Sequence, residues 1–374
     1  MSSTNEAVRP RRSSPPVEGT DAASNRFSPL RGVRDLREVG FLTGESSPNR
    51  TRTQWGIGGT DLGILFGDGP YLVAFGDTFS SEGDFSTGWR SNTLAIVENP
   101  CCDSVPVLSR MICDATGYAS EVIPSRKTDD DEKTVIPTGG FQIGDSLYMT
   151  FMSVRCWGIP GDWECNASGM VKSVDGGASW TSVASLSWPG DSGFVQQAAH
   201  KVGTFVYFWC IPAGRFGSVS LMRVAQDAVE DPAAYEYYLG LSSRGESLFA
   251  RGEEAMRQAS TLLSGPCGEL SVAYSPKVGG YLLASYNEVR RAILLQAAPA
   301  PEGPYGEPVP LAGAETGFLI YGGFLHSDFT AGDGGQRIGF TLSQWLPTYN
   351  IRWMEATLVT GDAPSHDRSE GDPK

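Results

Sequence analysis

Five short segments of the chain repeat one pattern, a run of aromatic and aliphatic residues bounded by glycine or another turn residue. Runs of this kind are typical of short β-strands. Helical periodicity is almost absent, and the sequences REVGF and EEAMRQAS are expected to form single helical turns at most. The five runs are 71–75 (YLVAF), 147–152 (LYMTFM), 205–210 (FVYFWC), 281–286 (YLLASY) and 338–342 (IGFTL).

The spacing of these runs predicts repeated modules of about four strands. Successive runs begin 76, 58, 76 and 57 residues apart. Modules of this size, repeated around a ring, are the blades of a β-propeller. We therefore predict an all-β, five-bladed β-propeller over residues 49–361. The segment NIRWMEATLV should complete a blade begun near the amino end, so that no long sheet edge stays open.

The two ends of the chain differ in composition from the predicted propeller. Residues 1–48 are rich in Ser, Pro, Arg and Asn, and residues 362–374 have a similar polar composition. Such segments lack the apolar residues needed for a packed core. We predict a disordered leader and a disordered tail. The leader contains no apolar run of the secretory type, so no export route is predicted and the localisation stays open.

Composition excludes several classes of function. The 374 residues include 43 Asp and Glu but only 29 Lys and Arg, a net charge of -14, which excludes nucleic acid as a partner because phosphate binding needs clustered cations. No run of eighteen apolar residues is present, so no membrane span is expected. With three histidines and no Cys-x-x-Cys pair, we expect no metal site and no cofactor. Among seven cysteines, Cys102 with Cys113 and Cys156 with Cys165 could form local disulfides, or all could stay reduced.

The sequence SVDGGASW, residues 173–180, fits the Asp-box pattern S-x-D-x-G-x-x-W. We predict a hairpin turn held by bonds from the Asp175 carboxylate to backbone amides and by packing of Trp180. Asp-boxes lie on the outer turns of propeller blades, so Asp175 is predicted to be structural. Sialidases carry several such boxes together with an arginine triad, and one box without that triad matches them poorly.

A polar residue precedes each of the five runs at a similar offset. The first strand of each propeller blade lines the central channel, so these side chains should converge on one mouth of the axis. The alternative is that they are ordinary polar residues at strand ends. They are Asp61, Thr138, the pair Gln196 and Gln197, Glu269, and His326.

Asp61 and Asp77 stand at the outer ends of one predicted hairpin, GGTDLGILFGDGPYLVAFGDTF. Cleavage of a glycosidic bond needs one carboxyl group to protonate the leaving oxygen and another to activate water or attack the anomeric carbon. Apolar surroundings raise the pKa of a carboxyl group and can keep it protonated. We predict that this pair is catalytic. The alternative is that Asp77 caps a turn with Thr78.

Other residues are candidates for supporting roles. Glu269 could be a third carboxylate that tunes or replaces one aspartate, or a structural residue at a strand end. His326 could orient a carboxylate, hold a water or bind a cation, or be a satisfied channel histidine. Arg215 could reach the groove or be a surface arginine. Aromatic faces and hydrogen-bonding groups suited to sugars are offered by Trp89, Arg90, Asn92, Trp157, Trp163 and Asn166.

Several motifs in this order resemble a bacterial and phage family, once catalogued as domain of unknown function 4185 and now classed as glycoside hydrolase family 183. The resemblance spans roughly residues 50–360. It implies a five-bladed propeller with endo-D-arabinanase activity on α-1,5-linked D-arabinofuranose chains of mycobacterial arabinogalactan and lipoarabinomannan. Two aspartates near the amino end are thought to act in that family, and Asp61 and Asp77 match them. The motifs are GGTDLG, FGDTF, GWRSN, IPTGG, the Asp-box, FVQQAA, PAGRFGSVSLMRV, GELSVAY and SQWLPTYNIRWMEATL.

We therefore expect an endo-acting hydrolase of D-arabinan that functions as a monomer. Inversion is the preferred stereochemistry, because opposite walls of a propeller funnel can leave room for a water molecule. Two alternatives remain. One is a non-catalytic carbohydrate-binding propeller, such as a phage tail module that grips arabinan, and the other is a hydrolase of another furanoside polymer.

Overall fold

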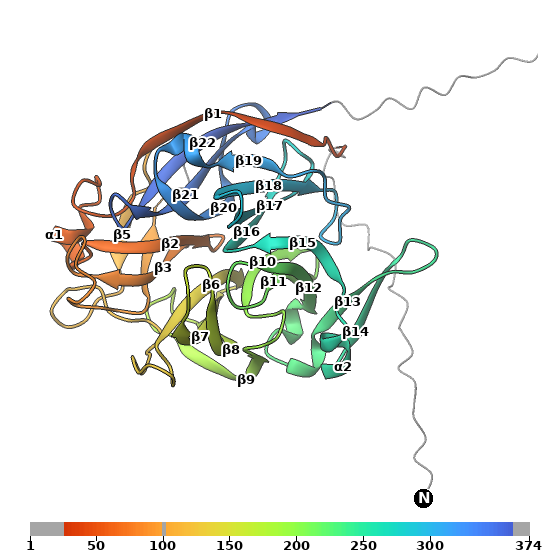
Figure 1. Cartoon of the computed structure of the whole chain (residues 1–374), viewed down its shortest axis with the longest axis horizontal. Helices are drawn as coiled ribbons and strands as arrows, with labels where there is room; N and C mark the ends of the chain where they lie inside the picture. Colours follow the sequence, from red (N-terminus) through yellow and green to blue (C-terminus); the bar gives the residue numbers. More distant parts are fainter. Residues whose placement is uncertain (1–25, 99–101, 362–374) are drawn as a thin grey trace, which may run out of the picture.

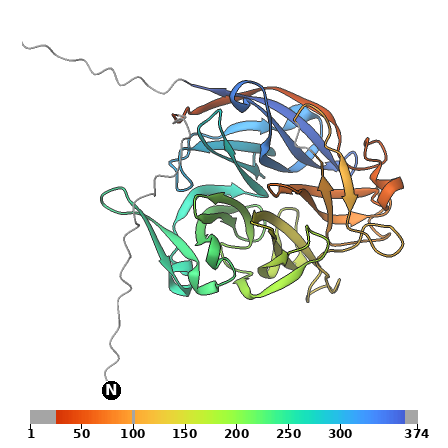
Figure 2. The same cartoon turned by 180° about the vertical axis from the view of Figure 1, so that it is seen from behind.

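In the computed structural model, which describes residues 26–98 and 102–361, five antiparallel sheets surround a common centre (Figure 1). The inner strand of each sheet contacts the inner strands of both neighbouring sheets, which closes the ring. Figure 2 shows the same ring from behind. The predicted five-bladed β-propeller is confirmed.

Each blade is one of these sheets, numbered in chain order, and its strands are given from the inside outward. Blade 1 contains β2 (Gly59–Phe66), β3 (Tyr71–Phe79), β4 (Thr93–Val97) and β5 (Leu108–Met111). Blade 2 contains β6 (Thr134–Ile143), β7 (Ser146–Trp157), β8 (Trp163–Ser173) and β9 (Thr181–Pro189). Blade 3 contains β10 (Gln196–Val202), β11 (Phe205–Ile211), β12 (Gly217–Ala225), β13 (Glu236–Leu241) and β14 (Ser247–Arg251), and β15 (Thr261–Cys267) pairs with β12.

The last two blades close the ring. Blade 4 contains β16 (Leu270–Ser275), β17 (Gly280–Asn287), β18 (Ala292–Ala298) and β19 (Val309–Ala312). Blade 5 contains β20 (Leu319–Ala331), β21 (Arg337–Leu346), β22 (Asn350–Thr360) and β1 (Leu30–Phe41). The helical segments are short: α1 (Thr51–Trp55), α2 (Glu253–Arg257), η1 (Gln226–Ala228), η2 (Pro232–Ala234), η3 (Ala314–Thr316) and η4 (Asp333–Gly335).

The five apolar runs of the sequence are the second strands of the five blades, β3, β7, β11, β17 and β21. A second strand lies between two strands of its own sheet and between two neighbouring blades, so both of its faces are buried. In β11, every residue after Phe205 is buried, whereas β9 at the edge of blade 2 is exposed at most positions. Burial on both faces produces a continuous apolar run, and this is why the second strands are recognisable in the sequence.

Closure of the ring requires a correction to the predicted leader. β1 forms the outer strand of blade 5 and pairs antiparallel with β22, from Leu30 opposite Thr360 to Phe41 opposite Arg352. Both views show this amino-terminal strand, in red, beside the blue carboxy-terminal strands (Figures 1 and 2). The prediction of a disordered leader up to residue 48 is therefore wrong for residues 30–48, since Leu42, Thr43 and Ser47 after β1 are also buried. β1 is an edge strand with several exposed charged residues, so its composition resembles that of a polar segment.

Several smaller predictions can also be compared with the structure. REVGF, expected as a single turn at most, is the end of β1, whereas the EEAMR segment is the five-residue helix α2. Residues 1–25 of the predicted leader and residues 362–374, the predicted tail, lie outside the described residues. Among the residues that the structure covers, no helix has the length and apolar character needed to cross a membrane.

The Asp-box forms the predicted turn between β8 and β9, the outer strands of blade 2. Asp175 Oδ1 accepts a hydrogen bond from the backbone N–H of Ser179 at 2.9 Å, and the Trp180 indole donates to the carbonyl of Gly177 at 3.0 Å. Hydrogen bonds from Ser179 and Ser173 lower the pKa of Asp175 to about 2. Asp175 is thus a structural residue, as predicted. Cys113, Cys156 and Cys165 are free thiols, so neither of the two possible local disulfides is formed.

Candidate active site

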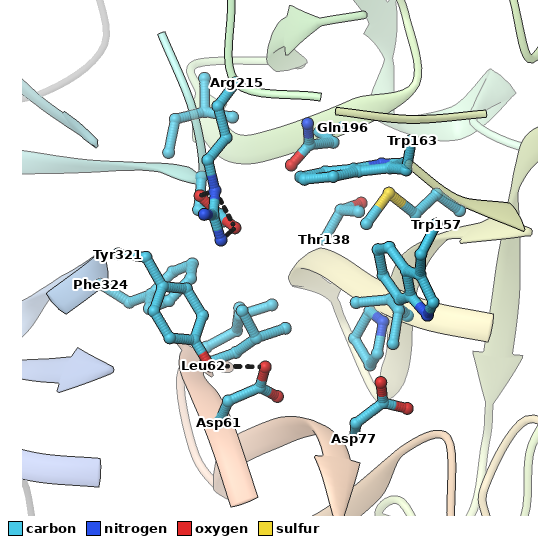
Figure 3. Close-up of a pocket in the computed structure, with 16 residues that line it drawn as sticks. Asp61, Leu62, Asp77, Thr138, Trp157, Trp163, Gln196, Arg215, Tyr321 and Phe324 are labelled. Atoms are coloured by element: carbon cyan, nitrogen blue, oxygen red, sulfur yellow. Dashed lines mark hydrogen bonds and ion pairs between the residues drawn. The ribbon is translucent and has the colours of Figure 1, made fainter. Parts of the chain in front are cut away.

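A pocket opens at one mouth of the central channel and receives residues from all five blades (Figure 3). Its volume is roughly 530 Å³ when the open space at its mouth is included. Four of the five polar positions predicted to line the channel meet here, namely Asp61, Thr138, Gln196 and Glu269, and Asp77 joins them. The other predicted members are Trp157, Trp163 and Arg215.

A β-bulge in β2 sets the direction of Asp61. Thr60 pairs with Thr78, but Leu62 pairs with Phe75, so Asp61 stands at the irregularity. The next two residues have positive φ angles, 65° at Leu62 and 90° at Gly63. Bulges with such conformations frequently re-aim a side chain beside a functional site.

Gly76 makes room for the Asp61 carboxylate. A Cβ atom at residue 76 would overlap Asp61 Oδ1 and would lie 3.0 Å from the Leu62 side chain. Only glycine therefore leaves the carboxylate in its position. This contact explains the motif FGD, because Gly76 makes room for Asp61 and the residue that follows it is Asp77.

Asp61 lies half-buried between two tyrosines. The Tyr321 hydroxyl donates to Asp61 Oδ2 at 2.8 Å, while Oδ1 is buried and accepts no hydrogen bond from any described residue. Burial raises the pKa of Asp61 to about 7, and the nearby Asp77 carboxylate adds to this effect. The hydroxyls of Tyr349 and Tyr321 oppose the rise by stabilising the charged form.

Asp77 has different partners from Asp61. Its Oδ1 accepts hydrogen bonds from the Trp89 indole at 2.8 Å and from the Thr134 hydroxyl at 3.0 Å. Burial raises the pKa of Asp77 to about 6, while these two donors and the positive charge of Lys127 act against the rise. Figure 3 shows both carboxyl groups facing the cavity. Between pH 6 and 7, one can therefore hold a proton while the other is ionised.

Glu269 forms an ion pair with Arg215 inside the pocket. The guanidinium donates to both carboxylate oxygens at 2.7 to 3.0 Å, and its Nη1 lies 3.6 Å from Glu288 Oε2. The rings of Tyr321, Tyr286 and Trp163 surround the guanidinium at 4.9 to 5.6 Å. Burial disfavours the charge of Arg215, but the carboxylate of Glu269 outweighs it and raises its pKa.

This pairing bears on the two roles considered for Glu269. A carboxylate clamped by a bidentate guanidinium is poorly suited to exchange protons with a substrate. Its negative charge nevertheless contributes to the raised pKa of Asp61. The geometry therefore favours the tuning role for Glu269 over replacement of an aspartate.

The pocket wall contains residues suited to contact a sugar. Trp157 and Trp163 lie with their ring centroids 5.6 Å apart at 76°, and Trp157 is 45% exposed. The side-chain amide of Gln196 donates to the carbonyls of Pro212 and Gly214, which orients it at the wall. Trp89 lies behind Asp77 and acts on the pocket through that residue.

Four predicted binding residues serve the structure instead. The side-chain amide of Asn92 donates to the carbonyls of residues 123 and 135 and accepts hydrogen bonds from the N–H groups of residues 122 and 123. Arg90 donates to the carbonyls of residues 56 and 119, and Asn166 donates to that of residue 131. Gln197 points away from the pocket because successive strand residues face opposite sides, and it donates to the carbonyl of residue 194.

His326 does not reach this pocket. It lines a second pocket at the other end of the inner strands, where its Nε2 lies 3.0 Å from the carbonyl oxygen of Gly67. β20 has 13 residues, and Tyr321, near its beginning, is the residue that enters the active-site pocket. The prediction that His326 joins the other polar positions at one mouth is therefore wrong. His326 lies further along β20 than Tyr321, at the opposite end of this inner strand.

Sequence reasoning missed Tyr321 and Tyr349, which flank Asp61, and also Phe324 and Met152 in the pocket wall. Tyr321 stands just before a glycine pair in β20, a signal that could have marked the start of this inner strand. Tyr349 lies between strands and carries no local signal. Within the described part of the chain, no three His, Cys, Asp or Glu side chains are placed to hold a metal ion.

Solved structures similar to this chain include a "putative hydrolase" from Bacteroides ovatus ATCC 8483, with a TM-score of 0.58 and 14% identity over 91% of this chain and 96% of that chain. The xylan beta-1,4-xylosidase from Bacillus halodurans C-125 has a TM-score of 0.45 and 12% identity over 85% of this chain and 60% of that chain. Trypanosoma rangeli sialidase has a TM-score of 0.43 and 8% identity over 80% and 45%.

At sequence identities this low, structural similarity is evidence for the fold alone. The sequence matches none of the curated proteins. A family model, described as domain of unknown function (DUF4185), matches residues 46–355, which include every strand of the propeller except β1 and the end of β22. The chain therefore belongs to the DUF4185 family.

Proposed function

We propose that this protein is an endo-acting glycoside hydrolase that cleaves α-1,5-linked D-arabinofuranose chains of arabinogalactan and lipoarabinomannan. The observation that carries the proposal is the pair of half-buried carboxyl groups, Asp61 and Asp77, which face one pocket and have pKa values of about 7 and about 6. Two carboxyl groups in different protonation states are the requirement for glycoside hydrolysis.

The pKa order and the hydrogen bonds of the two aspartates support one assignment of the roles. Asp61, with the higher pKa, is the general acid that donates its proton to the leaving glycosidic oxygen. Asp77, held by the Trp89 and Thr134 donors, is the base that removes a proton from the attacking water as that water bonds to the anomeric carbon. The C–O bond to the leaving sugar breaks in the same step, and the anomeric configuration inverts.

Charge in the pocket supports a neutral sugar as the substrate. Arg215 lines the pocket, and the carboxylates of Glu269 and Glu288 already neutralise its positive charge. A sugar carboxylate entering the pocket would meet Asp61, Asp77 and a compensated arginine, so sialic or uronic acids are disfavoured. The choice of D-arabinan among neutral polymers rests on the resemblance of the motifs to glycoside hydrolase family 183.

The test is incubation of the purified protein with D-arabinan, L-arabinan and a fructan, followed by chromatography of the products. We expect a ladder of oligosaccharides from D-arabinan and none from the other two polymers. Products from L-arabinan or fructan alone would assign a different furanoside. Binding of D-arabinan without any release of oligosaccharides would overturn the hydrolase and support a carbohydrate-binding propeller.

Stereochemistry needs a separate measurement. Proton NMR of the first products should show the β anomer before mutarotation, because hydrolysis of an α linkage with inversion yields β. The α anomer as the first product would mean that Asp77 acts as a nucleophile instead of a base.

A further inference from the structure

Two aromatic side chains outside the pocket form a stacked pair on the surface. Phe85, in the segment between β3 and β4, is 44% exposed, and Trp345, near the end of β21, is 46% exposed. Their ring centroids are 5.4 Å apart and the ring planes differ by 5°. We call Phe85 and Trp345 the rim pair. It bridges blade 1 and blade 5, and neither residue lines the pocket described above.

Tyr349 connects the rim pair to the candidate catalytic group. Its ring lies 5.2 Å from Phe85 and 5.3 Å from Trp345, edge-on to both. Its backbone carbonyl accepts a hydrogen bond from the N–H of Thr60 at 2.9 Å, and its hydroxyl stabilises the charged form of Asp61. One buried ring therefore separates the exposed pair from Asp61.

The rim pair is held in place before any ligand arrives. Phe79 packs edge-on against Phe85 at 5.0 Å, and Tyr349 supports both rings from the protein side. Rings fixed in this way lose little conformational entropy on binding. Trp157 offers another exposed ring on the blade 2 side of the pocket.

The size of the rim pair argues for a particular occupant. A stable protein partner needs about 800 Å² on each side, far more than two half-exposed rings supply. Two adjacent rings match one or two sugar rings, whose C–H faces pack on aromatic faces. The pair also adjoins the pocket through Tyr349, so one polymer chain could occupy both.

We propose that Phe85 and Trp345 form a stacking subsite for furanose residues of the same polysaccharide, outside the pocket on the blade 1 and blade 5 side. The chain then crosses the pocket between the rim pair and Trp157. Contacts on two sides of the scissile bond favour cleavage within a polymer over release of terminal sugars. This inference rests on the proposed function for the identity of the polymer.

The first measurement is binding of polymeric D-arabinan by affinity electrophoresis, with every variant made in an Asp61→Asn background that removes turnover. We expect Trp345→Ala and Phe85→Ala each to weaken binding about 3- to 10-fold, the range for loss of one aromatic contact. Trp345→Phe should retain most of the affinity. Tyr274→Ala is the matched control, because Tyr274 is a 37% exposed aromatic residue of blade 4 and does not line the pocket.

The second measurement is hydrolysis by the otherwise wild-type protein. Trp345→Ala should raise KM for the polymer about 3- to 10-fold and leave kcat on a short arabinoside within 2-fold, because a short substrate fills only the pocket. Thermal melts of each variant check that the fold is intact.

The outcomes separate this inference from the proposed function. Cleavage by the wild type with unchanged binding and KM in both alanine variants overturns the rim subsite alone. Binding that weakens in Trp345→Ala while the wild type cleaves nothing supports the subsite and overturns the hydrolase. If the wild type neither binds nor cleaves D-arabinan, both are overturned.

Discussion

The two mouths of the central channel are built by the same inner strands, and each holds a pocket, with volumes of roughly 530 and 560 Å³ when the open space at the mouth is included. At the second mouth the polar groups are satisfied by one another. Lys201 pairs with Asp68, and His326 contacts the Gly67 carbonyl and the N–H of Asp328. At the first mouth Asp61 keeps one buried carboxylate oxygen without a hydrogen bond from the described residues.

This difference teaches that pocket size does not identify the reactive end of the channel. Burial acts on both mouths, since it also lowers the pKa of His200 to about 4 at the second mouth. A neutral imidazole tolerates burial, whereas a carboxylate without full hydrogen bonding stores free energy that chemistry can use. The carboxylate oxygen of Asp61 that lacks a hydrogen bond therefore distinguishes the first mouth.

The largest expected effect comes from removing the acids. Asp61→Asn and Asp77→Asn should each lower kcat on D-arabinan by about 10²- to 10⁴-fold, because a general acid or base is lost. His326→Gln at the second mouth should change kcat by less than about 3-fold. Initial rates with circular dichroism of each variant test the comparison, and equal losses at both mouths would break it.

The next effect tests the room made for Asp61. Gly76→Ala should lower kcat by about 10-fold or more, because the added methyl group displaces the Asp61 carboxylate. Gly32→Ala is the matched control, since a Cβ atom there meets no other atom within 4 Å. Steady-state kinetics of the two variants measure the difference. Normal activity in Gly76→Ala would mean that the position of the carboxylate is not critical.

The pH profile sharpens the assignment of roles. We expect kcat/KM to rise as Asp77 ionises near pH 6 and to fall as Asp61 loses its proton near pH 7. Tyr321→Phe removes a hydrogen bond to the charged form of Asp61, so the pKa of Asp61 and the alkaline limb should both move upward. An unchanged alkaline limb in this variant would assign that limb to another group.

The last expected effect concerns stability. The pKa of Asp61 is raised from 3.8 to about 7 in the folded state, so its contribution to stability is present below pH 3.8 and is lost as the pH rises through 7. Asp61→Asn should therefore stabilise the protein at pH 8, by up to roughly 4 kcal/mol, and change little at pH 3.5. Urea unfolding at the two pH values measures this. A variant less stable than the wild type at pH 8 would contradict the burial of an ionised Asp61.

The position of the two aspartates could be predicted because its signal is local. Asp61 and Asp77 flank a single hairpin of blade 1, and adjacent antiparallel strands must bring its outer ends together. Trp157 and Trp163 were likewise predictable, because they flank one polar turn and pair across β7 and β8. The two tyrosines around Asp61 come from blade 5, 260 and 288 residues later in the chain, and no local pattern links them to it.

The amino-acid sequence by itself determined the number of blades, the second strand of each, the Asp-box turn and the acidic hairpin. Burial on both faces of a strand and pairing between neighbouring strands each produce a pattern that spans only a few residues of the sequence. Only the tertiary structure decided that β1 closes the ring, that Tyr321 and not His326 enters the active pocket, and that Arg215 neutralises Glu269. These features depend on how far each inner strand extends along the channel, and packing between blades sets that position.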